Sequence, residues 1–226
     1  MSEYSIIIPT LNEEDNIQRL LQHLKSFKKD KEIIIVDGGS GDNTLKLAES
    51  FGVKICKSPP GKGKQLNEGT KHAKGKILIY LHADTFLPTD AFNLVQEYFS
   101  RDEVRIATFK LSFDSNNFFM KTYCRFTNFD SMFTTFGDQA IIAKKEFINE
   151  MGGFPNIRIF EDVEFFRNVR KRTKIYKLPA SVITSGRRFY KKGIITTQLL
   201  NIYFFILYLL KVSPDKIYKR YFYDKF

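Results

Sequence analysis

The chain has 226 residues, enough for one large domain with a short appendage, and its 43% apolar and 15% aromatic content excludes a disordered chain. The formal net charge of +11 favours an anionic partner: a phosphorylated ligand, a nucleic acid or a membrane surface. Residues 187–226 hold nine Lys or Arg and two Asp or Glu, a net +7, and residues 1–186 carry the other +4. The basic character is therefore mainly a property of the C-terminus.

The two cysteines, Cys56 and Cys124, lack the spacing of a metal-binding knuckle. Two free thiols in a reducing compartment are the usual arrangement for such a pair. The first residues show neither the basic run nor the long apolar run of a secretory signal. We therefore expect a cytoplasmic setting.

Four apolar runs alternate with helical patterns in the first hundred residues. The runs, which we expect to form buried strands, span residues 4–8, 32–36, 53–56 and 77–81. Between them, apolar residues recur at helical spacing, as at Ile17, Leu20, Leu21 and Leu24. Alternation of helices with continuously apolar strands predicts an α/β fold, with a mostly parallel central sheet covered by helices on both faces.

The pattern after residue 100 is looser. We expect a strand within 104–114, a partly helical aromatic segment at 116–132 and another strand at 138–143. The segment EDVEFFRNVRKR, residues 161–172, begins with acids and ends with bases, which suits the dipole of a helix.

The C-terminal segment, residues 193–226, differs from the first 192 residues. Residues 202–210 are all apolar, and a basic, aromatic stretch, KVSPDKIYKRYFYDKF, follows them. A membrane-spanning helix needs roughly 20 mostly apolar residues, and polar residues interrupt this segment near its start. Two interpretations stay open: a helix that lies at a membrane interface, or a core or dimer helix with a solvated basic end.

Polar residues directly follow three of the expected strands. PTLNE follows the first strand, DGGSGD the second and HADT the fourth. Each could be an ordinary turn, and Asp42 alone suggests a helix N-cap. Because ligands of parallel sheets bind at the carboxyl ends of the strands, the three together predict one shared crevice.

Five segments in chain order carry a resemblance to a known family: SIIIPTLNEEDNI, IIIVDGGSGDNT, GKGKQLNEGTKHAKGKILIYLHADT, GDQAIIAKKEFINEMGGF and EDVEFFRNVRK. Together they resemble the small, single-domain members of glycosyltransferase family 2, which have the GT-A fold. The resemblance covers about residues 3–190. It implies an inverting enzyme that takes a sugar from a nucleotide diphosphate, with a UDP-sugar as the expected donor.

The resemblance places a metal and a catalytic base. Asp84 matches the aspartate that binds Mn²⁺ or Mg²⁺, and such a cation stabilises the diphosphate leaving group. His82 stands where the family has an acid; it would suit Mn²⁺ better than Mg²⁺, or would hydrogen-bond the donor instead. Asp162 matches the base that removes the proton of the acceptor hydroxyl, with Glu161 as its neighbour. Taken alone, both acids would be read as helix-start residues.

The other matched residues are expected to bind the donor. Asp37 can accept from a uracil N–H or from ribose hydroxyls, although a turn would also explain it. Lys62 and Lys64, at a helix start, can meet the diphosphate, or they are simply solvated. The resemblance adds Pro9, Thr10, Glu13, Asp138 and Gln139, and Arg187 and Arg188 are expected to reach a diphosphate or an anionic lipid head group.

Several motifs are missing, and their absence limits the function. GKGK is not followed by Ser or Thr, so it is no Walker motif, and DGGSGDNT lacks the third glycine of a dinucleotide fingerprint. The chain has no tryptophan and none of the Gln-x-x-Arg-Trp motif of processive synthases, which puts processive synthesis in doubt.

The sequence therefore predicts an inverting, metal-dependent glycosyltransferase, held peripherally at the inner face of the membrane. Its acceptor is not identified, and the membrane setting favours a lipid or lipid-linked one. One alternative is a nucleotidyltransferase of related fold, although its glycine-rich basic signature is lacking near the N-terminus. The other is a non-enzymatic binding protein of membrane surfaces or nucleic acids. Acids at the strand ends and the lack of any nucleic-acid-binding motif disfavour it. The sugar, the acceptor and the oligomeric state stay open.

Overall fold

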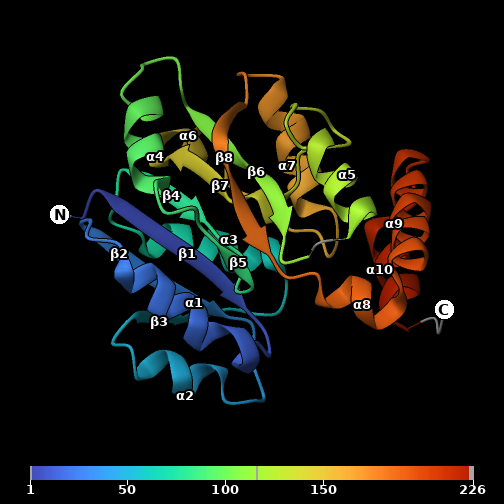
Figure 1. Cartoon of the computed structure of the whole chain (residues 1–226), viewed down its shortest axis with the longest axis horizontal. Helices are drawn as coiled ribbons and strands as arrows, with labels where there is room; N and C mark the ends of the chain where they lie inside the picture. The colour runs from blue at the N-terminus through green and yellow to red at the C-terminus, as the bar shows by residue number, and fades with distance from the viewer. Residues whose placement is uncertain (1, 116, 224–226) are drawn as a thin grey trace.

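An eight-stranded mixed sheet forms the centre of the computed structural model, which describes residues 2–115 and 117–223 except for the side chains of residues 188, 191, 192, 222 and 223 (Figure 1). The strand order is β3-β2-β1-β4-β7-β6-β8-β5. The strands are β1 (Tyr4–Thr10), β2 (Lys31–Asp37), β3 (Lys54–Lys57), β4 (Ile77–Tyr80), β5 (Thr85–Phe86), β6 (Ile106–Phe113), β7 (Ile141–Lys144) and β8 (Tyr176–Thr184).

The sheet brings several chain segments to one edge. β1 pairs in parallel with β2 and β4, so that Thr10 lies opposite Asp37 at the carboxyl ends of the strands. β7 runs antiparallel to β4, with Ile141 opposite Tyr80. The residues that precede β7 therefore arrive at the edge where β4 ends, which is where ligands of parallel sheets bind.

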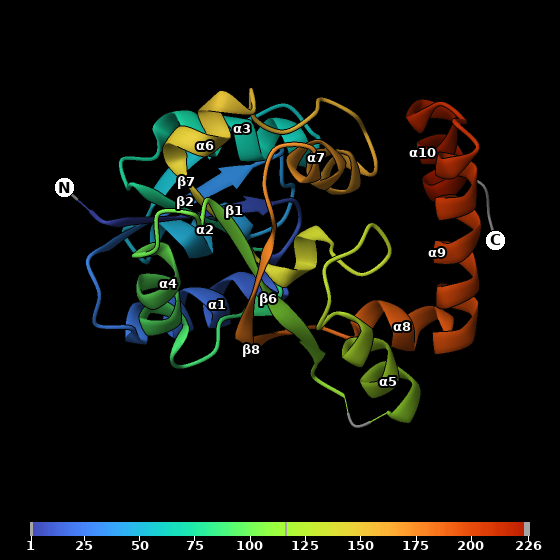
Figure 2. The same ribbon diagram turned by 90° about the horizontal axis from the view of Figure 1, so that it is seen from above.

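Helices cover both faces of the sheet, as Figure 2 shows. One face packs against α1 (Glu14–Ser26), α2 (Thr44–Glu49) and α4 (Ala91–Phe99), the other against α3 (Lys62–His72), α6 (Lys145–Glu150) and α7 (Glu161–Arg170). Successive residues of β1 divide between the faces: Ile6 and Ile8 join one core and Ile7 the other, all with no exposed surface. Each such burial stabilises the fold by roughly 1.5–3 kcal/mol.

A helical hairpin lies at one side of this body. α5 (Phe118–Phe126) and the 3₁₀ turn η1 (Gly137–Gln139) belong to the body, and α8 (Arg187–Lys192) leads to α9 (Ile194–Leu209) and α10 (Pro214–Tyr223). We call residues 194–223 the C-terminal hairpin; Figures 1 and 2 both show its two helices side by side at the edge of the molecule. None of the helices in the described residues is both long enough and apolar enough to cross a membrane. Residues 224–226 of the predicted C-terminal segment lie outside the described residues.

The predicted α/β fold and its four N-terminal strands are confirmed, with local differences. The strand expected at 138–143 begins only at Ile141, because Asp138 and Gln139 form η1. β8 is absent from the expected elements, since its sequence KLPAS breaks any alternation of apolar and polar residues. Its pairing with β6 shifts register between Thr108 and Lys110, and Pro179 falls in that irregularity, where a missing N–H is tolerated.

Candidate active site

Asp37 closes the turn after β2. Its carboxylate is buried and accepts hydrogen bonds from the N–H groups of Gly39 (2.9 Å) and Ser40 (3.0 Å) and from the Ser40 hydroxyl (2.5 Å). The turn alone thus explains the residue structurally, as the sequence allowed. A carboxylate has about four acceptor positions, and the fourth is met only by the long 3.5 Å contact from the Thr10 hydroxyl, so Asp37 retains capacity for one more donor.

Gln65 of α3 holds the ends of two strands together. Its amide Nε2 donates to the carbonyl oxygens of Thr10 and Val36, both at 2.8 Å, and the side chain is buried. A Cβ on Gly38 would lie 3.0 Å from that amide nitrogen, which accounts for the glycine after Asp37. The sequence analysis missed Gln65, and its only signal was a polar residue beside the apolar Leu66 on a buried helix face.

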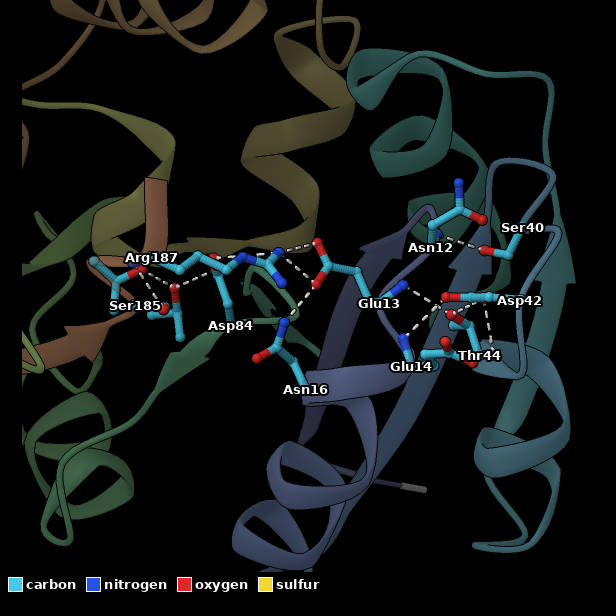
Figure 3. A network of polar contacts seen from close by, with 12 residues as sticks. Asn12, Glu13, Glu14, Asn16, Ser40, Asp42, Thr44, Asp84, Ser185 and Arg187 are labelled. Atoms are coloured by element: carbon cyan, nitrogen blue, oxygen red, sulfur yellow. Dashed lines mark hydrogen bonds and ion pairs between the residues drawn. The ribbon is translucent and has the colours of Figure 1, made fainter. Parts of the chain in front are cut away.

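Arg187 bridges Glu13 and Asp84, as Figure 3 shows. Its guanidinium donates to both carboxylate oxygens of Glu13, at 2.9 and 2.8 Å, and lies 4.0 Å from Asp84 Oδ2. Asn16 donates to the same Glu13 carboxylate at 2.7 Å. Burial would lower the pKa of Arg187, but the hydrogen bonds and charge of Glu13 raise it. α8 therefore supplies a permanent cation beside the acid at the end of β4.

Lys62 joins His82 to Glu161. Its ammonium lies 3.3 Å from His82 Nε2 and 4.0 Å from Glu161 Oε1. An ammonium can only donate, so Nε2 accepts and the imidazole is neutral. Burial, reinforced by the Lys62 charge, holds the pKa of His82 well below its usual value. Burial raises the pKa of Glu161 to about 7, although Lys62 opposes that rise.

Asp162 occupies the first turn of α7. Its Oδ2 accepts from the N–H of Gly137 at 2.7 Å, and its Oδ1 from the N–H of Val163 at 2.8 Å. A Cβ on Gly137 would lie 3.3 Å from Asp162 Oδ2 and 3.5 Å from His82 Nε2, so these two groups flank the glycine. Phe160, just before α7, has a left-handed φ of 65°, a conformation that costs about 1–3 kcal/mol in non-glycine residues and clusters at functional sites.

Asp138 lies within the electrostatic influence of Asp162 and Asp84. Its Oδ1 is buried without a hydrogen-bond partner among the described residues. Burial, followed by the charge of Asp162, raises its pKa to about 7. Gln139 differs, because its Nε2 donates to Thr134 O at 2.5 Å and its Oε1 accepts from Lys177. Asp138 is therefore coupled electrostatically to the acids of the site, whereas both polar atoms of the Gln139 side chain are occupied by hydrogen bonds within the protein.

Other expected donor ligands are less engaged. Lys64 is exposed on α3, Pro9 is half-buried within β1, and Thr10 is buried, with its hydroxyl 3.5 Å from Asp37 Oδ1. The side chain of Arg188 lies outside the described residues. The structure thus gathers most, but not all, of the expected residues around the ends of β1, β2 and β4.

The arrangement fits a cation that is shared with a substrate. No group of three His, Cys, Asp or Glu side chains in the described part of the chain could hold a metal by itself. Asp84 is partly exposed, and the unpartnered Asp138 Oδ1 lies in the same electrostatic environment. A hard cation that takes oxygens from a diphosphate and water needs only one or two protein carboxylates. His82 could join such a site only if its Nε2 left Lys62.

The sequence comparisons place the chain in a family. The model of "Glycosyl transferase family 2" matches residues 5–164. An uncharacterized glycosyltransferase of Rickettsia prowazekii is 40% identical over 89 residues, 37% of this chain and 28% of that protein. The poly(ribitol-phosphate) beta-N-acetylglucosaminyltransferase TarS of Staphylococcus aureus is 31% identical over 97 residues, 38% of this chain and 17% of TarS. The chain thus matches under a third of the length of either relative.

Solved structures show the same fold. The crystal structure of S. aureus TarS 1–349 superposes on 99% of this chain and 73% of that one, with a TM-score of 0.67 and 17% identity. A mannosyltransferase of Pyrobaculum calidifontis, in complex with GDP-Man and Mn²⁺, covers 81% of this chain and 56% of its own, with a TM-score of 0.64 and 20% identity. Both support the GT-A fold. Since the family model matches well over half of the sequence, the chain belongs to glycosyl transferase family 2.

Proposed function

We propose that this protein transfers a sugar, with inversion, from a nucleotide diphosphate to an acceptor hydroxyl, assisted by a divalent cation. One observation carries the proposal: Asp84 and Arg187 meet at the end of β4, while Asp162 approaches the same region from α7. Family membership favours glycosyl transfer over the nucleotidyltransferase and the non-enzymatic binding protein.

The donor side of the site is built for a nucleotide diphosphate. Asp37 would accept from the base or ribose, and Arg187 and Lys62 would meet the diphosphate oxygens. To do so, Arg187 has to exchange part of its contact with Glu13 for phosphate oxygens. Mn²⁺ or Mg²⁺ held at Asp84 would neutralise charge on the leaving diphosphate.

UDP is the nucleotide that we propose. TarS has been solved with UDP-GlcNAc, and the P. calidifontis mannosyltransferase with GDP-Man and Mn²⁺. The fold alone accommodates either base, so the choice rests on the resemblance of the Asp37 turn to the family's nucleotide-binding segment.

The transfer side consists of Asp162 and its supports. Its carboxylate would accept the proton of the acceptor hydroxyl as that oxygen attacks the anomeric carbon. The N–H groups of Gly137 and Val163, the latter in the first turn of α7, hold the carboxylate in place. The strained backbone at Phe160 sets where α7 begins, and with it the place of this base.

The acceptor, in this proposal, is lipid or lipid-linked. Exposed apolar residues form a helical stripe along α9, made of Ile195, Leu199, Ile202, Ile206 and Leu209. α5 adds three exposed phenylalanines, Phe118, Phe119 and Phe126. Exposed cations lie on α5 itself, at Lys121 and Arg125, and on α10, at Lys216, Lys219 and Arg220. Apolar burial combined with basic residues favours an anionic membrane surface.

The hairpin also reaches the transfer site. Phe205 of α9 packs near Phe133, Phe136 and Phe160, with ring centroids 5.6 to 6.4 Å apart, and Phe160 is two residues from Asp162. An acceptor lying in the membrane would therefore approach the base along the aromatic side of α9. In this proposal residues 1–192 form the catalytic domain, and residues 193–226 attach it peripherally to the inner face of the membrane.

A thermal-shift panel of nucleoside diphosphates, each with and without Mn²⁺, tests the donor and the cation. UDP should raise the melting temperature more than GDP or ADP, and more with Mn²⁺ than without it. Asp84→Asn should weaken Mn²⁺-dependent UDP binding about tenfold or more, as the loss of a metal ligand usually does. Equal UDP affinity with and without Mn²⁺, in both proteins, would remove the cation from the proposal.

Vesicle flotation tests the membrane surface. The full chain should float with vesicles that contain anionic lipid, and less so at high salt. Leu199→Ser/Ile202→Ser/Ile206→Ser should abolish flotation, whereas Ile183→Ser is the matched control, because Ile183 and Ile206 are both 48% exposed. A wild-type protein that stays at the bottom and runs as a dimer would make α9 a subunit interface.

A further inference from the structure

An open pocket of about 950 Å³ lies apart from the candidate active site. Its walls come from the end of α4, the loop after α5, and the segment that joins α7 to β8, all of which can be traced in Figure 1. None of the residues placed above in the donor or transfer site lines it. The volume is within the range of small-molecule sites.

Cations dominate the lining. The lining contains one acid, Asp130, and six cations, which are Arg101, Arg170, Lys171, Arg172, Lys174 and Lys177. Asp130 is already neutralised, because Arg170 donates to both of its oxygens, at 2.9 and 2.6 Å, and Thr135 donates at 2.7 Å. The net charge of the lining is therefore strongly positive.

Four of these cations have no carboxylate close enough for an ion pair. Arg101 pairs with Glu97 at 3.2 Å, but within the described residues no carboxylate lies within 4.0 Å of the other four, which are Lys171, Arg172, Lys174 and Lys177. Lys177 donates instead to the neutral Gln139. Burial lowers the pKa of Lys177 to about 8, and the charges of Asp130 and Asp138 oppose that shift only in part.

Aromatic rings line the same pocket. Phe129 is 74% exposed, and Lys174 lies 5.0 Å from the centre of the Tyr176 ring. A surface that serves only solvation needs neither an exposed phenyl ring nor cations gathered in a concavity. Clustered cations repel one another, so an anion that spans them would lower the free energy of this region.

We propose that this pocket binds a small anion with several phosphate groups, at a site separate from the donor site. Arg172 and Lys174 would meet the outer phosphates, and Lys177 the innermost one. Because Lys177 also contacts Gln139 of η1, the bound anion would adjoin the turn that carries Asp138 and supports Asp162. The proposal does not depend on the identity of the donor.

Isothermal titration of the full chain with tripolyphosphate, in EDTA, tests this site. Tripolyphosphate should bind at least tenfold more tightly than inorganic phosphate, because a single phosphate cannot span the cations. Arg172→Gln/Lys174→Gln should weaken its binding at least tenfold. Both residues are exposed, so the variant should fold normally.

Two controls separate the pocket from its competitors. Lys28→Gln/Lys46→Gln removes the same charge from exposed lysines elsewhere and should leave binding unchanged. Lys62→Gln/Lys64→Gln alters the donor side, where the proposed binding of phosphates is assisted by a cation that EDTA removes, so it should also leave the binding measured here unchanged. Equal weakening of tripolyphosphate binding in the Lys28/Lys46 variant would mean that only the overall charge matters. Loss of binding in the Lys62/Lys64 variant alone would place the anion in the donor site. Either result overturns the proposal.

Discussion

The body and the C-terminal hairpin use the same residue types for opposite purposes. Ile7 in β1 has no exposed surface, whereas Ile206 in α9 is 48% exposed. In the described part of α9, only Thr197 and Phe204 are buried. Apolar residues of the body build its core, whereas many of those in the hairpin remain exposed, as an interaction surface requires.

The charges divide in the same way. Acids of the body gather at the strand ends, where Asp138 and Glu161 have pKa values raised to about 7 by burial. The last forty residues instead carry a net +7. The acids of the candidate active site and most of the C-terminal cations thus lie in different regions, with Arg187 as the exception, and Phe160 with Phe205 is one of the contacts that join the regions.

The largest effect should come from Asp162→Asn. Loss of a general base lowers turnover roughly 100- to 10,000-fold, while the binding of donor should persist. The measurement is UDP release from the donor sugar nucleotide, beside UDP affinity. Glu146→Gln, at the first turn of α6, is the matched control, since it removes a helix-start acid far from the site. Flotation should be unchanged in both variants, and near-normal turnover in Asp162→Asn would remove its role as base.

The next effect contrasts two isoleucines. Ile7→Ala should lower the free energy of unfolding by about 2–5 kcal/mol, because it leaves a cavity between β1 and α3. Ile206→Ala should lower it by about 1 kcal/mol or less. Urea denaturation of both variants measures the difference. Similar losses would mean that α9 is part of the folding core and would end the contrast drawn above.

A smaller effect should appear as pH dependence in the body. The pKa of Asp138 is raised, so its protonated form favours the folded state, and this contribution is lost as the pH rises through about 7. Asp138→Asn should therefore stabilise the metal-free protein by about 1–3 kcal/mol at pH 8 and little at pH 4. Thermal unfolding in EDTA at both pH values checks this.

Asp130→Asn is the opposite control. Burial raises the pKa of Asp130, but the hydrogen bonds from Arg170 and Thr135 outweigh burial and lower it. Its ionised form favours the folded state, so this variant should lose stability at pH 8. If both variants shift in the same direction, burial of Asp138 does not control its ionisation.

Much of this organisation could be predicted from the sequence. Continuous apolar runs located the strands, and polar residues at their ends located Asp37 and Asp84 near a common edge. The family motifs added Asp162. Such signals are local, because they consist of the spacing of apolar residues and the position of polar residues along a short stretch of chain.

Other features could not be predicted because they arise from tertiary contacts. In the sequence Gln65 is one polar residue among several on a helix. Only the structure shows that its amide donates to the carbonyl oxygens of both Thr10 and Val36. Arg187 and Glu13 are 174 residues apart in sequence. The cationic pocket is likewise assembled from three segments, none of which has a recognisable motif.

The smallest effect concerns the contact between hairpin and body. Tyr208 of α9 donates to Glu164 of α7 at 2.7 Å, and burial raises its pKa to about 12, so that it stays a donor at neutral pH. Tyr208→Phe removes this bond, and a hydrogen bond to a charged group contributes about 1.5–3 kcal/mol when buried and less when part-exposed. A loss of about 1 kcal/mol would open the hairpin roughly fivefold more often.

Hydrogen–deuterium exchange followed by mass spectrometry can measure this, with peptides from α9 compared with peptides from β1. Exchange in α9 should quicken about fivefold in Tyr208→Phe, and exchange in β1 should not change. Tyr203→Phe is the matched control, because Tyr203 accepts a hydrogen bond from Arg220 within the hairpin and so leaves the contact with α7 intact. Equal acceleration of α9 in both variants would mean that the hairpin frays from within, and that the α7 contact does not hold it against the transfer site.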